Sequence, residues 1–211
     1  KTMDPDYMES IWWVFKQLWD KGLVYEGHKI LPYCPRCSTV LSNHELNLGG
    51  YQDVHDPAIT VRFAVKGEEN TYLLAWTTTP WTLISNVALA VGPEIEYVKV
   101  KTENTYVILD KERLSVLREE YEIIDEYKGL DLVGESYEQL FNYVPVDKKA
   151  FYVIDANFVS TGDGSGIVHI APAFGADDYK VGQKNNLGII TLVDREGKFI
   201  DGVGEFAGRF V

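Results

Sequence analysis

The first twenty residues follow the period of an amphipathic helix. Asp4-Pro5 offers an N-cap residue and a proline at the first helical position, and Gly22 stands where a helix C-terminus favours glycine. Between them, apolar side chains recur at steps of three and four residues: Ile11, Val14, Phe15, Leu18 and Trp19. With Trp12 and Trp13 added, the helix needs a large apolar surface to pack against. We expect a core helix of this domain; the alternative is a helix whose partner surface belongs to a larger protein.

Beyond residue 23 the pattern changes to short β-rich runs separated by Gly, Pro, Asn and Asp. Eight runs predict strands, at 58–65, 72–76, 87–91, 97–101, 105–109, 151–154, 167–170 and 189–193. Two stretches with helical spacing, 111–121 and 177–186, are predicted helices. Strands at this spacing are typical of a barrel or a sandwich. The predicted fold is therefore mixed α/β (α+β), a β-barrel-like domain with an N-terminal helical lead-in.

Composition then restricts the function classes. Hydrophobic residues make up 45% and charged residues 25% of the 211 residues, which is ordinary for a globular protein and excludes disorder as the main state. This length suits one domain, or one domain with a small appendage. No apolar run approaches the roughly 20 residues of a membrane span, so we expect no membrane partner. The net charge of −12 means that any nucleic-acid partner needs a local basic patch.

The two cysteines stand in the sequence Cys34-Pro35-Arg36-Cys37. Two thiols cannot form a secreted disulfide framework, so we expect a cytosolic thiol pair and a cytoplasmic protein. Their spacing resembles a metal knuckle more than a nucleophilic site. Zinc needs four ligands, however, and the pair supplies three at most if His44 joins it. Either Cys34 and Cys37 are half of a zinc site completed elsewhere, or the thiols are free.

The least ordinary stretch is 76–82 (WTTTPWT), with four hydroxyls between two indoles. Threonines often only fit the half-buried surface of a strand. The proline at position 80 ends the strand, however, and places Thr77, Thr78 and Thr79 at its mouth with unpaired backbone groups. Hydroxyls and free amides there form a neutral cradle for a ligand that carries carbonyl and hydroxyl oxygens.

The second unusual stretch is 164–179 (GSGIVHIAPAFGADDY). Its glycines precede a strand and lack a Gly-Lys-Ser ending, so we reject a phosphate loop. Asp177 and Asp178 begin a helix, where aspartates are more often caps than catalysts. Adjacent helical residues point about 100° apart, so one can cap while the other faces a pocket and binds a cation. A lone histidine on an apolar strand is usually a core or edge residue, and we expect this of His169.

Together these stretches resemble the editing domain inserted in isoleucyl-tRNA synthetases. The resemblance rests on 76–83 (WTTTPWTL), Asn86 and 164–179, and it covers essentially the whole chain. Pro80-Trp81 favours the isoleucyl family over its leucyl and valyl relatives, which carry an arginine near this proline. The adenylation signatures HIGH and KMSKS are absent, so the chain resembles an excised insertion of an ATP-dependent ligase. We divide it into a helix and CxxC region at 1–50 and an editing domain at 51–211.

The resemblance implies a role for each site residue. Asp178 would anchor the substrate α-ammonium, His169 would exclude isoleucine from the side-chain pocket, and Asp177 would cap. The residues expected to hold the terminal adenosine and the ester are Thr77, Thr78, Thr79 and Asn86, with Trp76, Thr82 and Gly166 as further substrate-binding positions. The implied reaction is hydrolysis of misformed valyl-tRNA(Ile), and of valyl-adenylate, by a positioned water, because one methylene gives only about 1–3 kcal/mol of discrimination, a limit for which this family is the standard illustration.

No cofactor is implied for editing, although zinc is expected in the longer protein, whose further cysteines follow the editing domain in the family. The implied partners are the 3′ acceptor end of tRNA(Ile) and the remainder of the synthetase. An inactive tRNA-binding or structural insertion is the alternative. The intact threonines and Asp178 favour the hydrolase, since a decayed site would have lost one of them.

Overall fold

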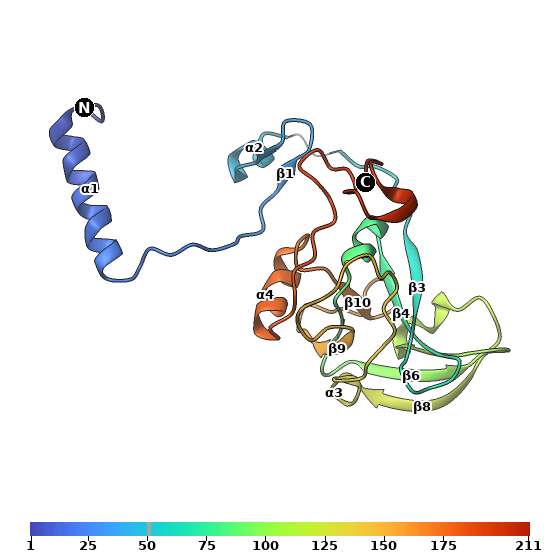
Figure 1. Ribbon diagram of the computed structural model, residues 1–211. Coiled ribbons are helices and arrows are strands. Elements are labelled where there is room, and N and C mark those ends of the chain that lie inside the picture. Colours follow the sequence, from blue (N-terminus) through green and yellow to red (C-terminus); the bar gives the residue numbers. More distant parts are fainter. Residues whose placement is uncertain (50–51) are drawn as a thin grey trace.

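The computed structural model describes residues 1–49 and 52–211 (Figure 1). Its helices are α1 (Pro5–Asp20), α2 (Asn43–Asn47), α3 (Gly129–Leu132) and α4 (Ala176–Lys184), with the 3-10 turns η1 (Pro80–Ser85), η2 (Lys111–Val116) and η3 (Gly204–Phe206). Its strands are β1 (Tyr33–Cys34), β2 (Thr39–Val40), β3 (Ile59–Ala64), β4 (Thr71–Thr77), β5 (Ala88–Val91), β6 (Glu96–Lys101), β7 (Tyr106–Asp110), β8 (Glu122–Lys128), β9 (Tyr152–Asp155) and β10 (Ile167–Ile170).

Two sheets enclose the main core. One has the order β3-β4-β7-β6-β8, in which only the β4–β7 pair is parallel. The other has the order β10-β5-β9, with β5 and β9 parallel. Both sheets contribute to one buried cluster that includes Phe63, Leu73, Leu89, Val153 and Ile167. The mixed α/β class is confirmed, but the described strands form open sheets and close no barrel.

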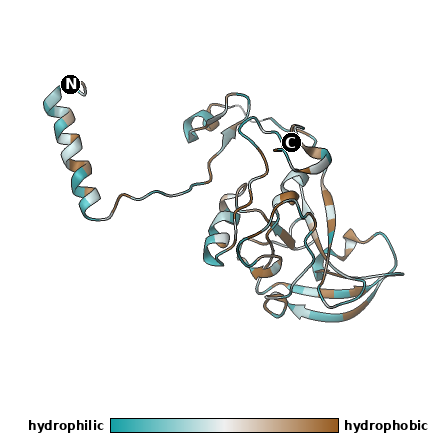
Figure 2. Ribbon diagram, in the orientation of Figure 1, coloured by the Kyte–Doolittle hydropathy of each residue, from teal (hydrophilic) through white to brown (hydrophobic). Residues whose placement is uncertain are grey.

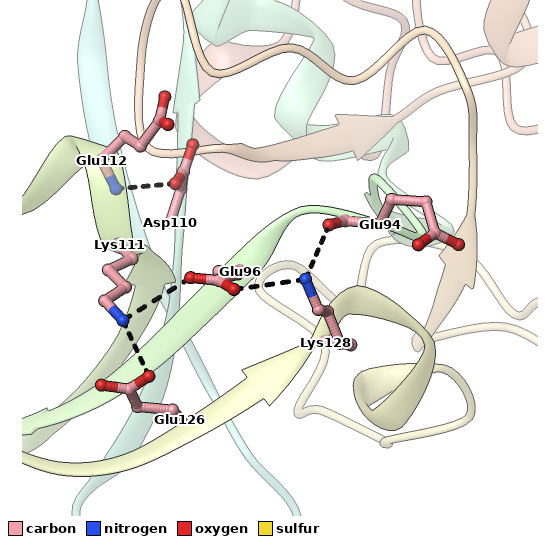
Figure 3. Close-up of polar contacts among 7 residues, drawn as sticks. All are labelled: Glu94, Glu96, Asp110, Lys111, Glu112, Glu126 and Lys128. Carbon is pink, nitrogen blue, oxygen red and sulfur yellow. Dashed lines mark hydrogen bonds and ion pairs between the residues drawn. The ribbon is translucent and has the colours of Figure 1, made fainter.

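The strand β8 was missed because its sequence, EIIDEYK, is rich in acidic residues that disfavour strands. It pairs with β6 at the edge of the larger sheet, where Lys111 of η2 and Lys128 of β8 form exposed ion pairs with glutamates of the two strands (Figure 3). Lys111 Nζ lies 2.8 Å from Glu126 and 3.5 Å from Glu96, and Lys128 Nζ lies 3.3 Å from Glu96. A charged edge of this kind also discourages pairing with another chain.

Other predictions need correction. The run 189–193 forms no strand; only Val193 makes an isolated bridge, to Phe199. The helix predicted at 111–121 is the single 3-10 turn η2, held by Asp110 Oδ1, which accepts the Glu112 N–H at 2.9 Å. The seven other predicted strands and α4 lie where they were expected, within a residue or two at each end.

The helix α1 is not a core helix, which corrects the preferred expectation. It contains no buried residue, and it stands apart from the sheets at the end of an extended segment (Figure 1). Its apolar side chains are exposed, with Trp12 73% accessible. Hydrophobic and hydrophilic positions are interspersed along the ribbon of α1 (Figure 2). The predicted stop is confirmed: Gly22 has φ +66°, and its N–H donates to Trp19 O.

The CxxC knuckle, residues 33–40, contacts the body. It is the β1–β2 ribbon, and Tyr33 Oη and Ser38 Oγ both donate to Arg195 O, at 3.1 and 3.2 Å. The predicted boundary between 50 and 51 lies outside the described residues. The helices of the described residues include none that is long and apolar enough to cross a membrane.

Candidate active site

Thr78 and Thr79 lie beyond the end of β4 as predicted, whereas Thr77, expected at the same mouth with an unpaired backbone, is still the last residue of the strand and pairs with Ile59. Thr77 is buried, and its Oγ1 accepts the Thr79 N–H at 3.1 Å, which turns the chain out of the strand. Pro80 then starts η1, because a proline suits the first position of a helical turn. Thr78 and Thr79 are exposed at this turn. Their hydroxyls therefore lie at the mouth of the strand, where a ligand can reach them.

Thr82 and His169 join the two distant segments. Thr82 Oγ1 lies 2.8 Å from Thr79 O and 3.0 Å from His169 Nε2. A hydroxyl has one proton, and a carbonyl can only accept, so Thr82 donates to Thr79 O and accepts from His169 Nε2–H. His169 Nδ1 is consequently the bare acceptor, and it is buried without a hydrogen-bond partner among the described residues.

Burial also decides the charge of His169. The residue is 7% exposed, and desolvation lowers its pKa to about 4. At neutral pH the ring is therefore uncharged. Since His169 stands opposite Leu89 on β5 and beside η1, it presents bulk and a single acceptor nitrogen rather than a cation.

The two aspartates divide between solvent and interior. Asp177 is 61% exposed and pairs with Lys180 at 2.8 Å. Asp178 Oδ2 accepts the Ala171 N–H at 2.9 Å, and its side chain folds over Gly175, the N-cap residue of α4. Burial raises the pKa of Asp178 above its ordinary value, opposed by that hydrogen bond and reinforced by the charge of Asp177. Asp177 thus forms an ion pair at the position where a cap was expected.

An aromatic contact also holds the two segments together, and sequence reasoning missed it. Trp81 of η1 meets Phe174 edge to face, with ring centroids 4.9 Å apart. Such pairs stabilise by about 0.5–1.5 kcal/mol beyond the area that they bury. The signal was present, because both aromatics lie inside the two unusual stretches. The threonines, His169 and Asp178 are thereby gathered on adjoining segments.

Three other predicted site residues are engaged in the fold. The Asn86 side chain donates to Ala88 O at 2.8 Å and accepts from Tyr137 Oη at 2.7 Å. Gly166 has φ +73°, its O accepts from Tyr97 Oη, and a Cβ there would lie 2.2 Å from Asp110 Cβ. Trp76 is half-buried against Gly164. Tyr137 was also missed, and nothing in the sequence linked it to Asn86.

The cysteines supply part of a metal site at most. Hydrogen bonds from the Cys37 backbone and thiol lower the pKa of Cys34, which favours the thiolate that a metal needs. No three His, Cys, Asp or Glu side chains gather as a metal site in residues 1–49 and 52–211, so His44 does not join the pair. Two thiolates fit zinc chemistry but leave half of a tetrahedral site to other ligands.

With this geometry established, comparison with known proteins identifies the family. Residues 1–162 match the model of the class I tRNA synthetases (I, L, M and V). The chain belongs to this family. It is 56% identical over 210 residues to an isoleucine–tRNA ligase of Clostridium acetobutylicum and 55% identical over 208 residues to that of Clostridium tetani, covering 100% and 98% of this class I chain. The chain spans about a fifth (20%) of the length of these relatives.

The fold of this class I synthetase chain is similar to the crystal structure of GlLeuRS-CP1. The TM-score is 0.53, the identity 18%, and the match covers 61% of this chain and 60% of the other. At this identity the likeness concerns the fold alone. It agrees with the mixed α/β sheets described above, and it shows that the resemblance recognised in the sequence extends to the arrangement of the strands.

Proposed function

We propose that this chain is the editing module of an isoleucine–tRNA ligase and hydrolyses the ester of valyl-tRNA(Ile). The observation that carries the proposal is the hydrogen bond between Thr82 and His169, which joins the threonine segment to β10, together with the Asp178 carboxylate held at Ala171, two residues beyond His169. It joins a neutral hydrogen-bonding cradle, an uncharged pocket wall and a carboxylate. An aminoacyl ester carries the complementary groups: carbonyl and ribose oxygens, an aliphatic side chain and an ammonium.

Each group then has one task. The Asp178 carboxylate binds the α-ammonium, and its contact with Ala171 N–H fixes its direction. The hydroxyls of Thr78 and Thr79 bind the ester and stabilise the charge that develops on its oxygen. The His169 ring limits the depth of the aliphatic pocket. Positioning of a water supplies the rate, and the vicinal ribose hydroxyl of the substrate assists; we assign no protein side chain as general base.

The context follows from the family. The acceptor end of tRNA(Ile) delivers the ester, and the remainder of the synthetase, an ATP-dependent ligase, produces it. Editing itself uses no metal in this proposal. A zinc ion would bind Cys34 and Cys37 only with two further ligands from the longer polypeptide, and a cytoplasmic location stays a prediction.

Deacylation of valyl-tRNA(Ile) tests the proposal. Asp178→Ala removes the partner of the ammonium, and deletion of one member of a partly desolvated charge pair costs roughly 2–5 kcal/mol, so hydrolysis should become undetectable or nearly so. Asp177→Ala is the matched control, because it removes the neighbouring, exposed carboxylate. Wild-type deacylation by Asp178→Ala would refute the assignment. A folded wild-type chain that hydrolyses no valyl-tRNA would favour the inactive insertion instead.

A further inference from the structure

Ser165 lies at the point where the strands β4 and β7 separate. The last residue pair of these two parallel strands is Leu73 with Ile108. Just beyond it, Ser165 Oγ donates to Leu74 O at 2.6 Å, and Ser165 O accepts the Asp110 N–H at 3.0 Å. Ser165 therefore bonds β4 through its side chain and the end of β7 through its backbone.

The hydroxyl of Ser165 is shielded from solvent. The residue is 1% exposed, so a variant without the hydroxyl leaves a buried carbonyl on β4 with no water to replace the donor. The flanking glycines allow the close approach: a Cβ on Gly164 would lie 2.9 Å from the ring of Trp76, and one on Gly166 would lie 2.2 Å from Asp110 Cβ. The loop thus comes near enough to both strands for a short side chain to reach β4.

Two neighbouring contacts hold the same loop to other elements. Tyr97 Oη donates to Gly166 O at 2.7 Å and ties the loop to β6, and Arg113 of η2 donates to Gly164 O at 2.9 Å. The Ser165 hydroxyl is the group that reaches β4, the strand that leads into the threonine segment. Since β10 begins two residues after Ser165, this hydrogen bond fixes the position of β10 along the length of β4.

The candidate site is divided between these two strands. The threonine segment follows the end of β4, whereas β10 carries His169 and leads to Ala171, whose N–H holds the carboxylate of Asp178. At about 3.3 Å per residue, the hydrogen bond of Ser165 lies at most roughly 13 Å before His169. Both strands run from this bond toward the site, so a displacement of β10 along β4 would change the separation of the carboxylate from the threonines.

We infer that Ser165 is a positioning residue for the hydrolysis, because its hydrogen bond to Leu74 sets how far Asp178 and the His169 ring stand from the threonine hydroxyls. The inference rests on the proposed function, in which Asp178 binds the ammonium and the threonines bind the ester. One substrate then spans groups from both strands, and its reactive geometry depends on their offset. A displacement of about 1 Å can cost roughly a hundredfold in rate although the reacting groups are unchanged.

The first measurement reads this offset without a substrate. His169 Nε2–H donates to Thr82 Oγ1 at the site end of the two strands, and its proton can be followed by NMR in a chain with four histidines. Ser165→Ala should speed exchange of this proton with solvent roughly tenfold or more. Ser85→Ala is the matched control, since Ser85 is buried but its Oγ has no hydrogen-bond partner among the described residues. Equal exchange in Ser165→Ala and the wild type would overturn the inference.

The second measurement is deacylation of valyl-tRNA(Ile) and isoleucyl-tRNA(Ile), beside a melting curve. Ser165→Ala should lower kcat for the valyl ester roughly tenfold to a hundredfold, with KM little changed, and should narrow the ratio between the two esters. Tyr97→Phe removes the neighbouring hydrogen bond to the same loop and should lower the melting temperature without changing the ratio. Equal changes of kcat and ratio in both variants would show a general loosening of the loop and would contradict the role of Ser165.

Together the two measurements separate this inference from the proposed function. An active wild type whose kcat and ester ratio persist in folded Ser165→Ala would refute the positioning role and leave the hydrolase standing. A wild type that hydrolyses neither ester, with faster exchange of the His169 proton in Ser165→Ala, would reject the hydrolase and support Ser165 as the residue that sets the offset of the two strands.

Discussion

The N-terminal helix and the strand β5 show how differently two apolar segments are used in one chain. β5, with the sequence ALAV, is buried at all four positions and lies between two partner strands. The helix α1 is longer and richer in aromatic residues, yet no residue in it is buried. Hydrophobic content therefore does not indicate what a segment packs against. The sheets complete their own core, whereas α1 carries an apolar surface that the described residues do not cover.

The largest expected effect is a loss in the free energy of unfolding when a buried residue of β5 is truncated. Leu89→Ala removes a side chain that is fully buried between the two sheets. Truncation of a buried leucine costs about 2–5 kcal/mol, through lost transfer free energy and the cavity left behind. Ile11→Ala on α1, where the side chain is exposed, should change the free energy of unfolding by less than about 0.5 kcal/mol. Urea unfolding of both variants measures the difference, and similar losses would show that α1 is packed in solution.

Acid should lower the free energy of unfolding, because His169 is buried in its neutral form. Its folded pKa of about 4 lies below the ordinary 6.5, so the unfolded state binds a proton more readily. The stability from the neutral ring is complete above pH 6.5 and is lost as the pH falls toward 4. The lowered pKa corresponds to about 3 kcal/mol. Asp178, whose pKa is raised, acts in the opposite direction, because its protonation relieves a buried charge.

Unfolding free energies of His169→Phe between pH 7 and pH 4 test this claim. The variant keeps a ring but cannot take up the proton, so its stability should fall less steeply than that of the wild type. His44→Gln changes an exposed histidine and should retain the wild-type slope. If His169→Phe and the wild type lost stability in parallel, the histidine would not be buried as described.

Local patterns predicted the fold wherever burial and turn chemistry agree. The strand β4 is a largely apolar run that ends at Thr77, shortly before Pro80 starts η1, and both the run and the proline are visible in the sequence. The strand β8 could not be predicted, since its EIIDEYK sequence becomes a strand only through pairing with β6 and the lysines beside it. The opposite error occurred at 189–193, where an apolar run resembles a strand but makes only an isolated bridge, between Val193 and Phe199.

The sequence predicted which residues belong to the candidate site better than it predicted their contacts. The exposed position of Thr78 and Thr79 followed from a proline, and helical geometry predicted that Asp177 and Asp178 point in different directions. Only the family resemblance selected Asp178 as the inward residue, which the structure holds against Ala171. The hydrogen bond between Thr82 and His169 spans 87 positions of sequence, and no local pattern encodes it. Nor could the sequence reveal that the Asn86 amide is occupied by Tyr137 and Ala88. Hydrogen bonds between residues far apart in the sequence therefore decide which polar side chains remain available to a ligand.

Truncation of His169 should also change which aminoacyl-tRNA is hydrolysed, by a free energy smaller than the two changes in stability above. If the ring sets the depth of the aliphatic pocket, the additional carbon of isoleucine overlaps it, and overpacking of that size costs about 1–3 kcal/mol. His169→Ala should therefore accept isoleucyl-tRNA tenfold to a hundredfold better, while hydrolysis of valyl-tRNA falls modestly. Deacylation of both charged tRNAs beside a melting curve measures this. A folded variant that still refuses isoleucyl-tRNA would mean that the ring does not limit the pocket.

The smallest effect is expected from removal of the exposed helix. A variant that lacks residues 1–24 loses α1 and its glycine stop but no residue of the buried clusters. Its free energy of unfolding should stay within about 0.5 kcal/mol of the wild type, because exposed positions contribute little. The three indoles of α1 are open to solvent, whereas Trp76 and Trp81 are half-buried. Iodide should therefore quench most tryptophan fluorescence of the whole chain and much less of the truncated one. A loss of more than 1 kcal/mol, or equal quenching of both proteins, would place α1 on the sheets and remove the contrast with β5.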